Sequence, residues 1–335
     1  MMRKLYLILM LFLFSINMNS RNRALIVGVG DYPEESGWRH ISSLNDVSLL
    51  CSSLPSGYEI QTLTDASATH EGIINLFDTL VCLSMPGDTL FVHFSCHGQQ
   101  MLTDGKEEPD YLDESLVPYD ASSKRSESYW GQNHLIDNEI GVYIDKFRRN
   151  IVPDGLVVVT VDACFSDSMN KGGKDQRIIR GGLPAFGTNY ISEDSLRFVE
   201  ANSARQDSSA LETSDELSDI IILSACKTYE RNMEIVSDGT GYGSLSYAIS
   251  QSFLKYGFGD LSLWLKEILT CMDKIAYLQE PQVRTTIEGL YESDGICVQT
   301  PMTEKRGGIS VPVIVGIILL FGTAGIIVLW KRRKK

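Results

Sequence analysis

The strongest constraint on the fold is the segment 157–166, which reads VVVTVDACFS. A run of β-branched apolar residues without alternation is typical of a strand in a parallel sheet, because both faces of such a sheet are covered. In open α/β sheets the functional groups lie just beyond the carboxyl ends of the strands. Cys164 follows this strand directly. The segment therefore predicts an α/β protein with Cys164 at the functional edge of its sheet.

A second strand of the same kind, 89–94, leads into His97 and Gly98. If the two strands are neighbours, His97 faces Cys164 across one edge of the sheet. A histidine beside a cysteine can accept its proton, which makes the pair a nucleophilic dyad. The backbone amides of Gly98 and Cys164 are the expected donors of an oxyanion hole. Taken singly, a buried structural cysteine and a turn histidine remain the alternatives.

Composition excludes some classes of protein. The chain has 335 residues, enough for one large domain or two small ones, and a formal net charge of −13. An acidic chain is not expected to bind nucleic acid, which requires a basic face. None of the seven cysteines has the spacing of a metal site, and the odd number leaves at least one outside any disulfide.

Both ends of the chain carry membrane-related signals. Residues 1–20 place a basic pair before a short apolar run, which predicts an export signal peptide, with an uncleaved anchor as the alternative. After a linker at 304–308, residues 309–330 are apolar and long enough to form a transmembrane helix. The basic tail 331–335 is expected to stay in the cytoplasm. We therefore expect a single-pass membrane protein whose folded part lies on the exported side, periplasmic or extracellular.

Strands and helices alternate between these ends, which predicts βαβ units and a largely parallel sheet. Expected strands lie at 23–29, 59–63, 89–94, 157–161, 220–225 and 295–298, and expected helices at 44–54, 69–83, 136–149, 243–255 and 261–277. Residues 101–133 are polar and are expected to form a long loop with an ordered insert at 112–120, and residues 170–218 are polar and aperiodic, so they are expected to form a long exposed loop. His93 is expected in the core, and His40, His70 and His134 in solvent.

The motifs, taken in order, resemble the caspase/metacaspase clan of cysteine peptidases. The similar segments are 44–46 (LND), 95–99 (SCHGQ), 113–120 (DESLVPYD), 162–166 (DACFS), 223–226 (LSAC) and 241–245 (GYGSL). The resemblance covers roughly residues 23–298. It implies a caspase-like three-layer α/β sandwich with a mainly parallel central sheet over 21–303. Within it, a larger part spans 21–169, a processing loop 170–218 and a smaller part 219–303.

The resemblance also implies roles for particular residues. His97 would be the general acid/base and Cys164 the nucleophile. Metacaspases cleave after Arg or Lys, and their acidic pocket would correspond to Asp46 and Asp162, with Ser95 beside them. Two carboxylates beyond adjacent strand ends would form charge-assisted hydrogen bonds with a basic side chain. The alternatives are a helix N-cap for Asp46 and a strand-end turn residue for Asp162.

Calcium is the one metal that the resemblance brings in. Many metacaspases bind it through aspartates, and the corresponding residues here are Asp113, Asp137 and Asn138. Oxygen ligands suit Ca²⁺, but Asn138 stands where the family often has a second aspartate. We therefore expect no required cofactor and keep calcium as an option. Two further departures, Phe165 for a histidine and Asp167 for a glycine, lie beside the dyad.

The sequence thus predicts an exported, membrane-anchored cysteine endopeptidase that acts on proteins or peptides after Arg or Lys. Self-processing is expected in the loop 170–218, which carries basic residues at 171, 174, 177, 180, 197 and 205. The alternatives are a caspase-like protein of different specificity, or an inactive, membrane-anchored interaction protein whose acidic loops bind a cationic partner.

Overall fold

The computed structural model describes residues 20–102, 112–165, 178–190, 211–228, 230–290 and 298–299. The chain divides into two compact units, Met1–Pro301 and Met302–Lys335, and every described residue belongs to the first. The predicted export signal, apart from Ser20, and the predicted linker, transmembrane helix and tail lie outside the described residues. Among the described residues, no helix has the length and apolarity needed to cross a bilayer.

A seven-stranded sheet forms the centre of the unit, in the order β12-β11-β8-β7-β3-β1-β2. Its strands are β1 (Asn22–Gly28), β2 (Tyr58–Thr64), β3 (Thr89–Ser95), β7 (Leu156–Asp162), β8 (Asp219–Ser224), β11 (Gln282–Thr285) and β12 (Val298–Gln299). The first five are parallel to one another, and β11 runs antiparallel to β8. The expectation of a mainly parallel sheet is therefore confirmed.

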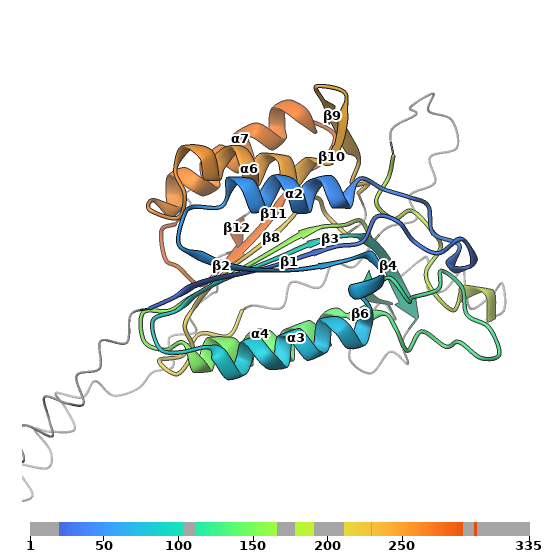
Figure 1. Cartoon of the computed structure of the whole chain (residues 1–335), viewed down its shortest axis with the longest axis horizontal. Helices are drawn as coiled ribbons and strands as arrows, with labels where there is room; N and C mark the ends of the chain where they lie inside the picture. Colours follow the sequence, from blue (N-terminus) through green and yellow to red (C-terminus); the bar gives the residue numbers. More distant parts are fainter. Residues whose placement is uncertain are drawn as a thin grey trace, which may run out of the picture. The chain divides into compact units, whose positions relative to one another are not determined.

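Helices cover both faces of this sheet, and Figure 1 shows the three layers. One face carries α2 (Ser43–Ser53), α6 (Ser244–Lys255) and α7 (Leu261–Ile275), and the other carries α3 (His70–Leu83) and α4 (Asp137–Asn150). Alternate residues of each strand enter different cores. Leu25 and Val92 pack toward α3 and α4, whereas Ile26 and Phe91 pack toward α2, α6 and α7. Covering both faces explains why these strands are apolar throughout.

Side-chain caps fix the ends of two helices. The Thr69 hydroxyl accepts a hydrogen bond from the Gly72 amide at 3.0 Å, and α3 begins there. The Asp260 carboxylate accepts one from the Leu263 amide at 2.9 Å at the start of α7. Such caps satisfy amides that have no partner within the helix.

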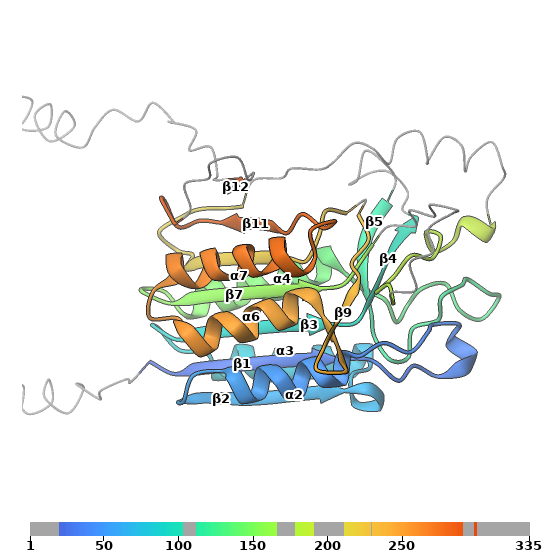
Figure 2. The same ribbon diagram turned by 90° about the horizontal axis from the view of Figure 1, so that it is seen from above.

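The segment 101–133 is only partly a loop, and the ordered insert expected at 112–120 contains a strand. A small sheet, β4 (His97–Leu102), β5 (Leu112–Val117) and β6 (Leu135–Ile136), leaves the main sheet at His97 and carries part of this segment. Figure 2 shows β4 and β5 beyond the end of β3. β4 and β5 contain several polar side chains, so they lack the continuous apolar run that is typical of a buried strand.

Two further expectations about exposure are wrong. His134 is buried, and its ring forms hydrogen bonds with Gln99 and Tyr129 at 3.0 Å each. Part of the loop 170–218 is not exposed, since Arg180 lies entirely inside the protein. His93 is in the core as expected, between Thr160 and Ser246, and His40 is exposed.

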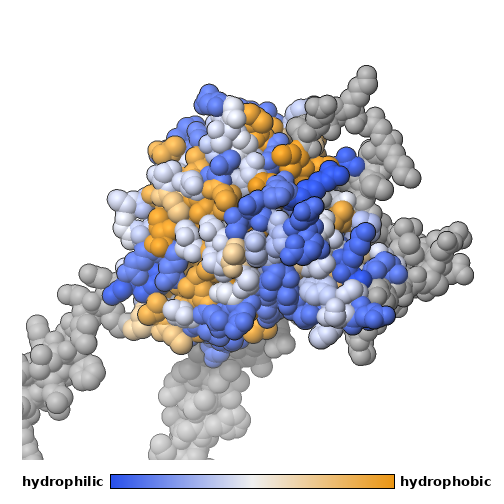
Figure 3. All heavy atoms as spheres, turned by 45° about the vertical axis from the view of Figure 1, so that its right-hand side comes forward, coloured by the Kyte–Doolittle hydropathy of each residue, from blue (hydrophilic) through white to orange (hydrophobic). Residues whose placement is uncertain are grey.

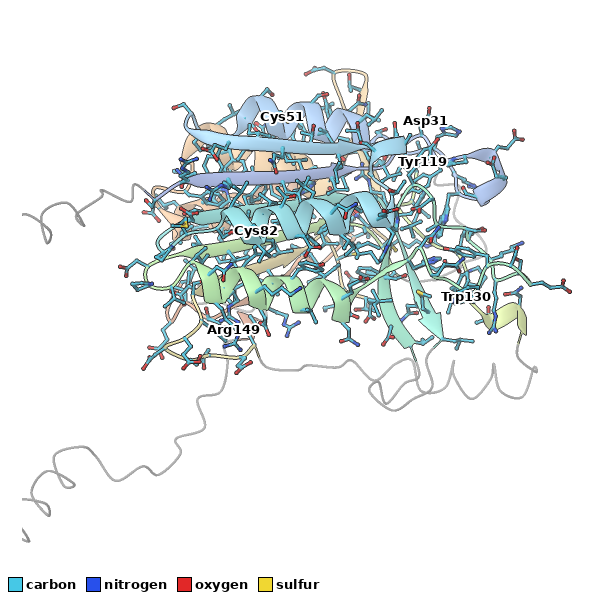
Figure 4. All side chains as sticks on the ribbon, turned by 60° about the horizontal axis from the view of Figure 1, so that its bottom comes forward. Asp31, Cys51, Cys82, Tyr119, Trp130 and Arg149 are labelled. Carbon is cyan, nitrogen blue, oxygen red and sulfur yellow. The ribbon has the colours of Figure 1, made fainter. Side chains whose placement is uncertain are left out.

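No disulfide joins the six cysteines within the described parts of the chain. Cys51 on α2 and Cys82 on α3 lie on helices that cover opposite faces of the sheet, as Figure 4 shows. The carboxyl ends of the parallel strands meet on the right-hand side of Figure 1. Figure 3 brings that side forward and shows hydrophilic side chains interspersed with smaller hydrophobic areas.

Candidate active site

Three of the predicted site residues meet at the carboxyl edge of the sheet. Ser95 ends β3 and is in register with Asp162, which ends β7. Asp46 comes from α2, which approaches β1 at Gly28, where a Cβ would lie 2.3 Å from a methyl group of Val47. Asp46, Ser95 and Asp162 are all fully buried. The structure thus brings together the residues of the predicted acidic pocket.

The Asp46 carboxylate does not cap α2. Its Oδ1 accepts a hydrogen bond from the Gly243 amide at 2.9 Å, and its Oδ2 accepts one from the Ser95 hydroxyl at 2.7 Å. Burial, together with nearby Asp162, raises the pKa of Asp46 to about 6, although Arg180 opposes this. The N-cap alternative for Asp46 is therefore wrong.

The Asp162 carboxylate is held by two other residues. Its Oδ2 accepts hydrogen bonds from the amide and the hydroxyl of Ser246, at 2.7 and 2.6 Å. Its Oδ1 accepts one from the Asn232 side chain at 2.6 Å. Burial opposes ionisation, but Arg180 and these hydrogen bonds outweigh it and lower the pKa of Asp162. Asp162 is therefore ionised beside the pocket at neutral pH.

A third carboxylate, Glu234, also belongs to the pocket, although no sequence motif predicts it. Glu234 begins β9 (Glu234–Ser237), which forms a hairpin with β10 (Thr240–Gly243). Its carboxylate accepts hydrogen bonds from the amide and the hydroxyl of Ser42 at 2.6 and 2.7 Å. The pair Asp238-Gly239, both at positive φ, is the turn signal that marks this hairpin.

The guanidinium of Arg180 lies among these groups. Its Nη2 donates to Asp46 at 2.6 Å and to Glu234 at 3.1 Å, and its Nη1 donates to Ser95 at 2.7 Å. Asp162 Oδ1 is 3.8 Å from Nη1. Burial alone would lower the pKa of Arg180, but the three carboxylates outweigh it and raise the pKa above its usual value. One fully buried cation thus meets three buried carboxylates.

The backbone of Arg180 is held as firmly as its side chain. Its carbonyl oxygen accepts hydrogen bonds from the amides of Cys164 at 2.8 Å and Gly98 at 3.4 Å. Its amide donates to the carbonyl of Asn232 at 3.0 Å, and the carbonyl of Ile178 accepts from Glu234 at 2.9 Å. The residues before the Arg180 carbonyl therefore run antiparallel to 232–234, as an added strand.

His97 presents one ring nitrogen for chemistry. Its Nε2 bonds to the carbonyl of Arg39 at 2.8 Å, which makes Nε2 the protonated nitrogen. Its Nδ1 is buried and has no hydrogen-bond partner among the described residues. The ring stacks on Trp38 with centroids 4.9 Å apart. Burial lowers the pKa of His97 to about 4, so at neutral pH Nδ1 is a proton acceptor.

Cys164 follows β7 and is fully buried. Its thiol donates to the carbonyl of Glu230 at 3.1 Å, and the Cys226 thiol lies 3.7 Å from the same oxygen. A hydrogen bond with Cys164, followed by burial, raises the pKa of Cys226 well above its usual value. The Cys164 thiol is thus directed at the carbonyl of Glu230.

The predicted calcium ligands lie elsewhere, on β5 and at the start of α4. Asp137 Oδ1 accepts a hydrogen bond from the Asn138 amide at 2.8 Å. Burial, with a smaller contribution from Asp113, raises the pKa of Asp137 to about 6. Within the described parts of the chain, no three His, Cys, Asp or Glu side chains gather as a metal site.

The arrangement contains what acyl transfer needs. The thiol of Cys164 and the imidazole of His97 follow two neighbouring strands, two backbone amides bind the carbonyl oxygen of Arg180, and carboxylates hold the side chain of the same arginine. The sequence itself matches the family described as "Caspase domain" over residues 21–293. The chain belongs to this family. The family match therefore confirms the resemblance that the sequence motifs indicated, and it agrees with the fold described above.

The protein is similar to metacaspases over most of its length. It is 24% identical to Metacaspase-1B of Aspergillus fumigatus over 298 residues, covering 78% of this chain and 69% of that protein. It is 23% identical to Metacaspase-1 of Mycosarcoma maydis, covering 81% and 71% respectively. It also shares its fold with protein GSU0716 of Geobacter sulfurreducens, with a TM-score of 0.55, 19% identity and coverage of 84% and 98%. The caspase-domain protein is accordingly a cysteine-type endopeptidase of the caspase/metacaspase type.

Proposed function

We propose that this endopeptidase cleaves after arginine, and more slowly after lysine, and that it cuts its own chain between Arg180 and Gly181. The observation that carries the proposal is the position of Arg180. Its guanidinium lies among Asp46, Asp162 and Glu234, while its carbonyl oxygen lies on the amides of Gly98 and Cys164. A peptide substrate with a basic residue before the cleaved bond would bind in the same way.

In the proposed reaction His97 Nδ1 takes the proton of the Cys164 thiol, and the thiolate attacks the Arg180 carbonyl carbon. The amides of Gly98 and Cys164 stabilise the oxyanion that forms. His97 then donates its proton to the Gly181 nitrogen, the C–N bond breaks, and Gly181 becomes a free amine. Water, deprotonated by His97, hydrolyses the thioester, which releases the Arg180 carboxylate and restores the thiol.

Self-processing is tested with the full-length protein and the mass of its fragments. Wild-type protein should yield a fragment that begins at Gly181, whereas Cys164→Ala and Arg180→Gln should stay intact at this bond. Lys174→Gln, a basic residue elsewhere in the loop, should be cut as wild type. A wild-type preparation that cleaves arginine peptides but never this bond would contradict self-processing alone.

Specificity is tested with internally quenched peptides that differ only in Arg, Lys or Asp before the cleaved bond. We expect cleavage after Arg, slower cleavage after Lys, and none after Asp, because buried carboxylates repel a further one. Preferential cleavage after Asp would contradict the roles proposed for Asp46, Asp162 and Glu234.

The second candidate is an inactive caspase-like protein in which Arg180 permanently fills the pocket. The Cys164 thiol bonded to Glu230 rather than to His97 favours it. A thiol-reactive probe separates the two. An active enzyme loses its peptidase activity when Cys164 is labelled, whereas an inactive protein cuts no peptide before or after labelling.

Calcium is proposed as an optional activator. Asp113, Asp137 and Asn138 supply three oxygen donors, fewer than the six to eight that Ca²⁺ takes, so water or backbone carbonyls would have to complete the site. Because an optional activator is not required, adding a chelator should lower peptide cleavage without abolishing it. A complete loss restored by Ca²⁺ would make calcium a required cofactor.

We also propose that residues 309–330 anchor the protein in a membrane with the peptidase on the exported side. The proposal is supported by the apolar run and by the five cations after it. Membrane fractionation and protease protection in whole cells test it. Peptidase in the soluble fraction, or protected inside intact cells, would contradict it.

A further inference from the structure

The segment after Arg180 is bound to the protein at a second place. Beyond Gly181 and Gly182 the chain runs along β4, where the amide of Phe186 donates to Gln100 at 2.7 Å. The amide of Leu102 donates to the carbonyl of Phe186 at 3.1 Å. Gln99 Nε2 donates to the carbonyl of Pro184 at 2.7 Å. The segment therefore adds to the edge of β4 through its main chain, a mode of peptide binding that requires no particular sequence.

A pocket beside this edge takes the Phe186 ring, which is only 4% exposed. Tyr129 meets the ring edge to face with centroids 5.7 Å apart, and the His134 ring is 4.8 Å away. Gly131 forms part of the wall, since a Cβ there would lie 2.9 Å from Phe186 Cε1. Tyr129 and His134 also hydrogen-bond to each other at 3.0 Å, which fixes both rings.

The pocket depends on residues that the proposed reaction does not use. Tyr129, Gly131 and His134 lie in the connection between β5 and β6, outside the dyad and the acidic pocket. Gln99 links the two places, because its side chain accepts from His134 at 3.0 Å and donates to Pro184. We define these four residues, 99, 129, 131 and 134, as the aromatic pocket.

We propose that the aromatic pocket is a second recognition site for substrates, which takes an aromatic side chain six residues after the cleaved arginine. This inference rests on the proposed function, because it treats the chain's own segment as a bound substrate. Substrates would then be extended polypeptides with a basic residue at the cleaved bond and Phe, or a similar ring, at the sixth position beyond it.

The geometry supports a peptide rather than another ligand. Main-chain hydrogen bonds on β4 give affinity, and one apolar pocket at a fixed distance gives selectivity. An aromatic ring contributes much of its binding through area and edge-to-face contacts, without any charge. With both the acidic pocket and the aromatic pocket occupied, the enzyme would select among the many proteins that contain an arginine.

The test uses full-length enzyme carrying Phe186→Ala, so that its own segment leaves the aromatic pocket open. Internally quenched peptides copy residues 178–189, with either Phe or Ala at position 186. A shorter peptide ends at Leu183. We expect the Phe peptide to be cleaved with a kcat/KM at least tenfold higher than the Ala peptide, mainly through a lower KM.

A matched enzyme identifies the pocket as the cause. Tyr129→Ala in the same Phe186→Ala background should remove the advantage of the Phe peptide and should cleave the short peptide at an unchanged rate. Equal cleavage of the Phe and Ala peptides, with the short peptide also cleaved, would overturn the second site and leave the proposed function standing. Failure to cleave any arginine peptide would overturn both.

Discussion

The carbonyl oxygen of Arg180 accepts a hydrogen bond from the amide of Cys164 at 2.8 Å. A peptide carbonyl in this position is bound where charge would develop during attack by the thiol on the same residue. The structure therefore holds a peptide bond of its own chain at the proposed reaction centre.

Replacing Arg180 should destabilise the protein. In a Cys164→Ala background, where no cut can occur, Arg180→Gln leaves three buried carboxylates facing one another. The expected loss is about 3 kcal/mol at pH 8, and less if the segment leaves and water enters. The loss should shrink at pH 5. Burial already raises the pKa of Asp46 to about 6, and the pKa rises further without the cation, so Asp46 is protonated there.

Urea unfolding at the two pH values measures this effect. Arg149→Gln is the control, because Arg149 makes an exposed ion pair with Glu216 at 3.7 Å. Such a pair contributes at most about 1 kcal/mol. A variant of Arg180 as stable as the control at pH 8 would mean that the carboxylates do not depend on it.

Peptide cleavage should depend on the ionisation of Asp46. Burial raises the pKa of Asp46 to about 6. Because the ionised carboxylate binds the arginine side chain, the kcat/KM for an arginine peptide should rise with pH through an inflection near pH 6. Asp46→Asn should lose about 2 kcal/mol of binding, roughly 30-fold in kcat/KM, together with this inflection. A flat wild-type profile from pH 5 to 8 would contradict the role of Asp46.

Arginine should be preferred to lysine by roughly tenfold, since both terminal nitrogens of Arg180 have partners and a lysine has one nitrogen. Ser95, which accepts from Nη1 at 2.7 Å, should carry part of this preference. Ser95→Ala is expected to lower the ratio of kcat/KM for arginine peptides to kcat/KM for lysine peptides. Ser48 is exposed on α2, so Ser48→Ala should leave this ratio unchanged. An unchanged ratio in both variants would exclude Ser95 as a determinant.

Glycine at position 181 should be required for the self-cut. Its φ is +148°, and a Cβ would lie 2.0 Å from the carbonyl oxygen of Cys164. That atom belongs to the backbone, so it cannot rotate away. Gly181→Ala should slow the cut after Arg180 at least tenfold, measured as fragment formed over time. Leu183→Ala is the control, and a Gly181→Ala protein cut at the wild-type rate would refute the requirement.

Cys226 should support the reactivity of Cys164, because both thiols donate hydrogen bonds to the carbonyl oxygen of Glu230, Cys164 at 3.1 Å and Cys226 at 3.7 Å. Removing one such bond costs about 1 kcal/mol, so Cys226→Ala should lower kcat/KM about fivefold while the fold is kept. Cys82→Ala changes an exposed cysteine on α3 and should have no effect. The two variants are compared on one arginine peptide, and equal activity would remove Cys226 from the mechanism.

Much of the fold could be predicted from the sequence because the parallel strands are buried on both faces. An apolar run as short as 157–161, bounded by turn residues, is typical of a buried strand, and the ends of such runs locate Ser95, Asp162 and Cys164. The antiparallel edge elements were harder to find. The polar residues of β4 and β5 conform to no buried pattern, and β9 and β10 have only four residues each.

The pocket was predicted in part for a related reason. Asp46 lies in a motif at the start of an expected helix, and Asp162 lies in a motif at the end of an expected strand. Glu234, in contrast, lies on a short hairpin that the sequence did not predict. Arg180 is 134 residues from Asp46 in sequence, and its basic side chain in a polar loop suggested exposure. A buried arginine needs several carboxylates around it. Here the carboxylates come from distant parts of the chain, so no local sequence pattern indicates that Arg180 is buried.

The cleaved bond would lie in the connection between β7 and β8, which are hydrogen-bonded neighbours in the main sheet. Cutting this connection would therefore produce two polypeptides that share one sheet and one pair of hydrophobic cores. Denaturing gels would show two bands, while native chromatography would show a single particle of unchanged size. Processing would act as a nick that frees a new amino terminus and a new carboxyl terminus within an intact body.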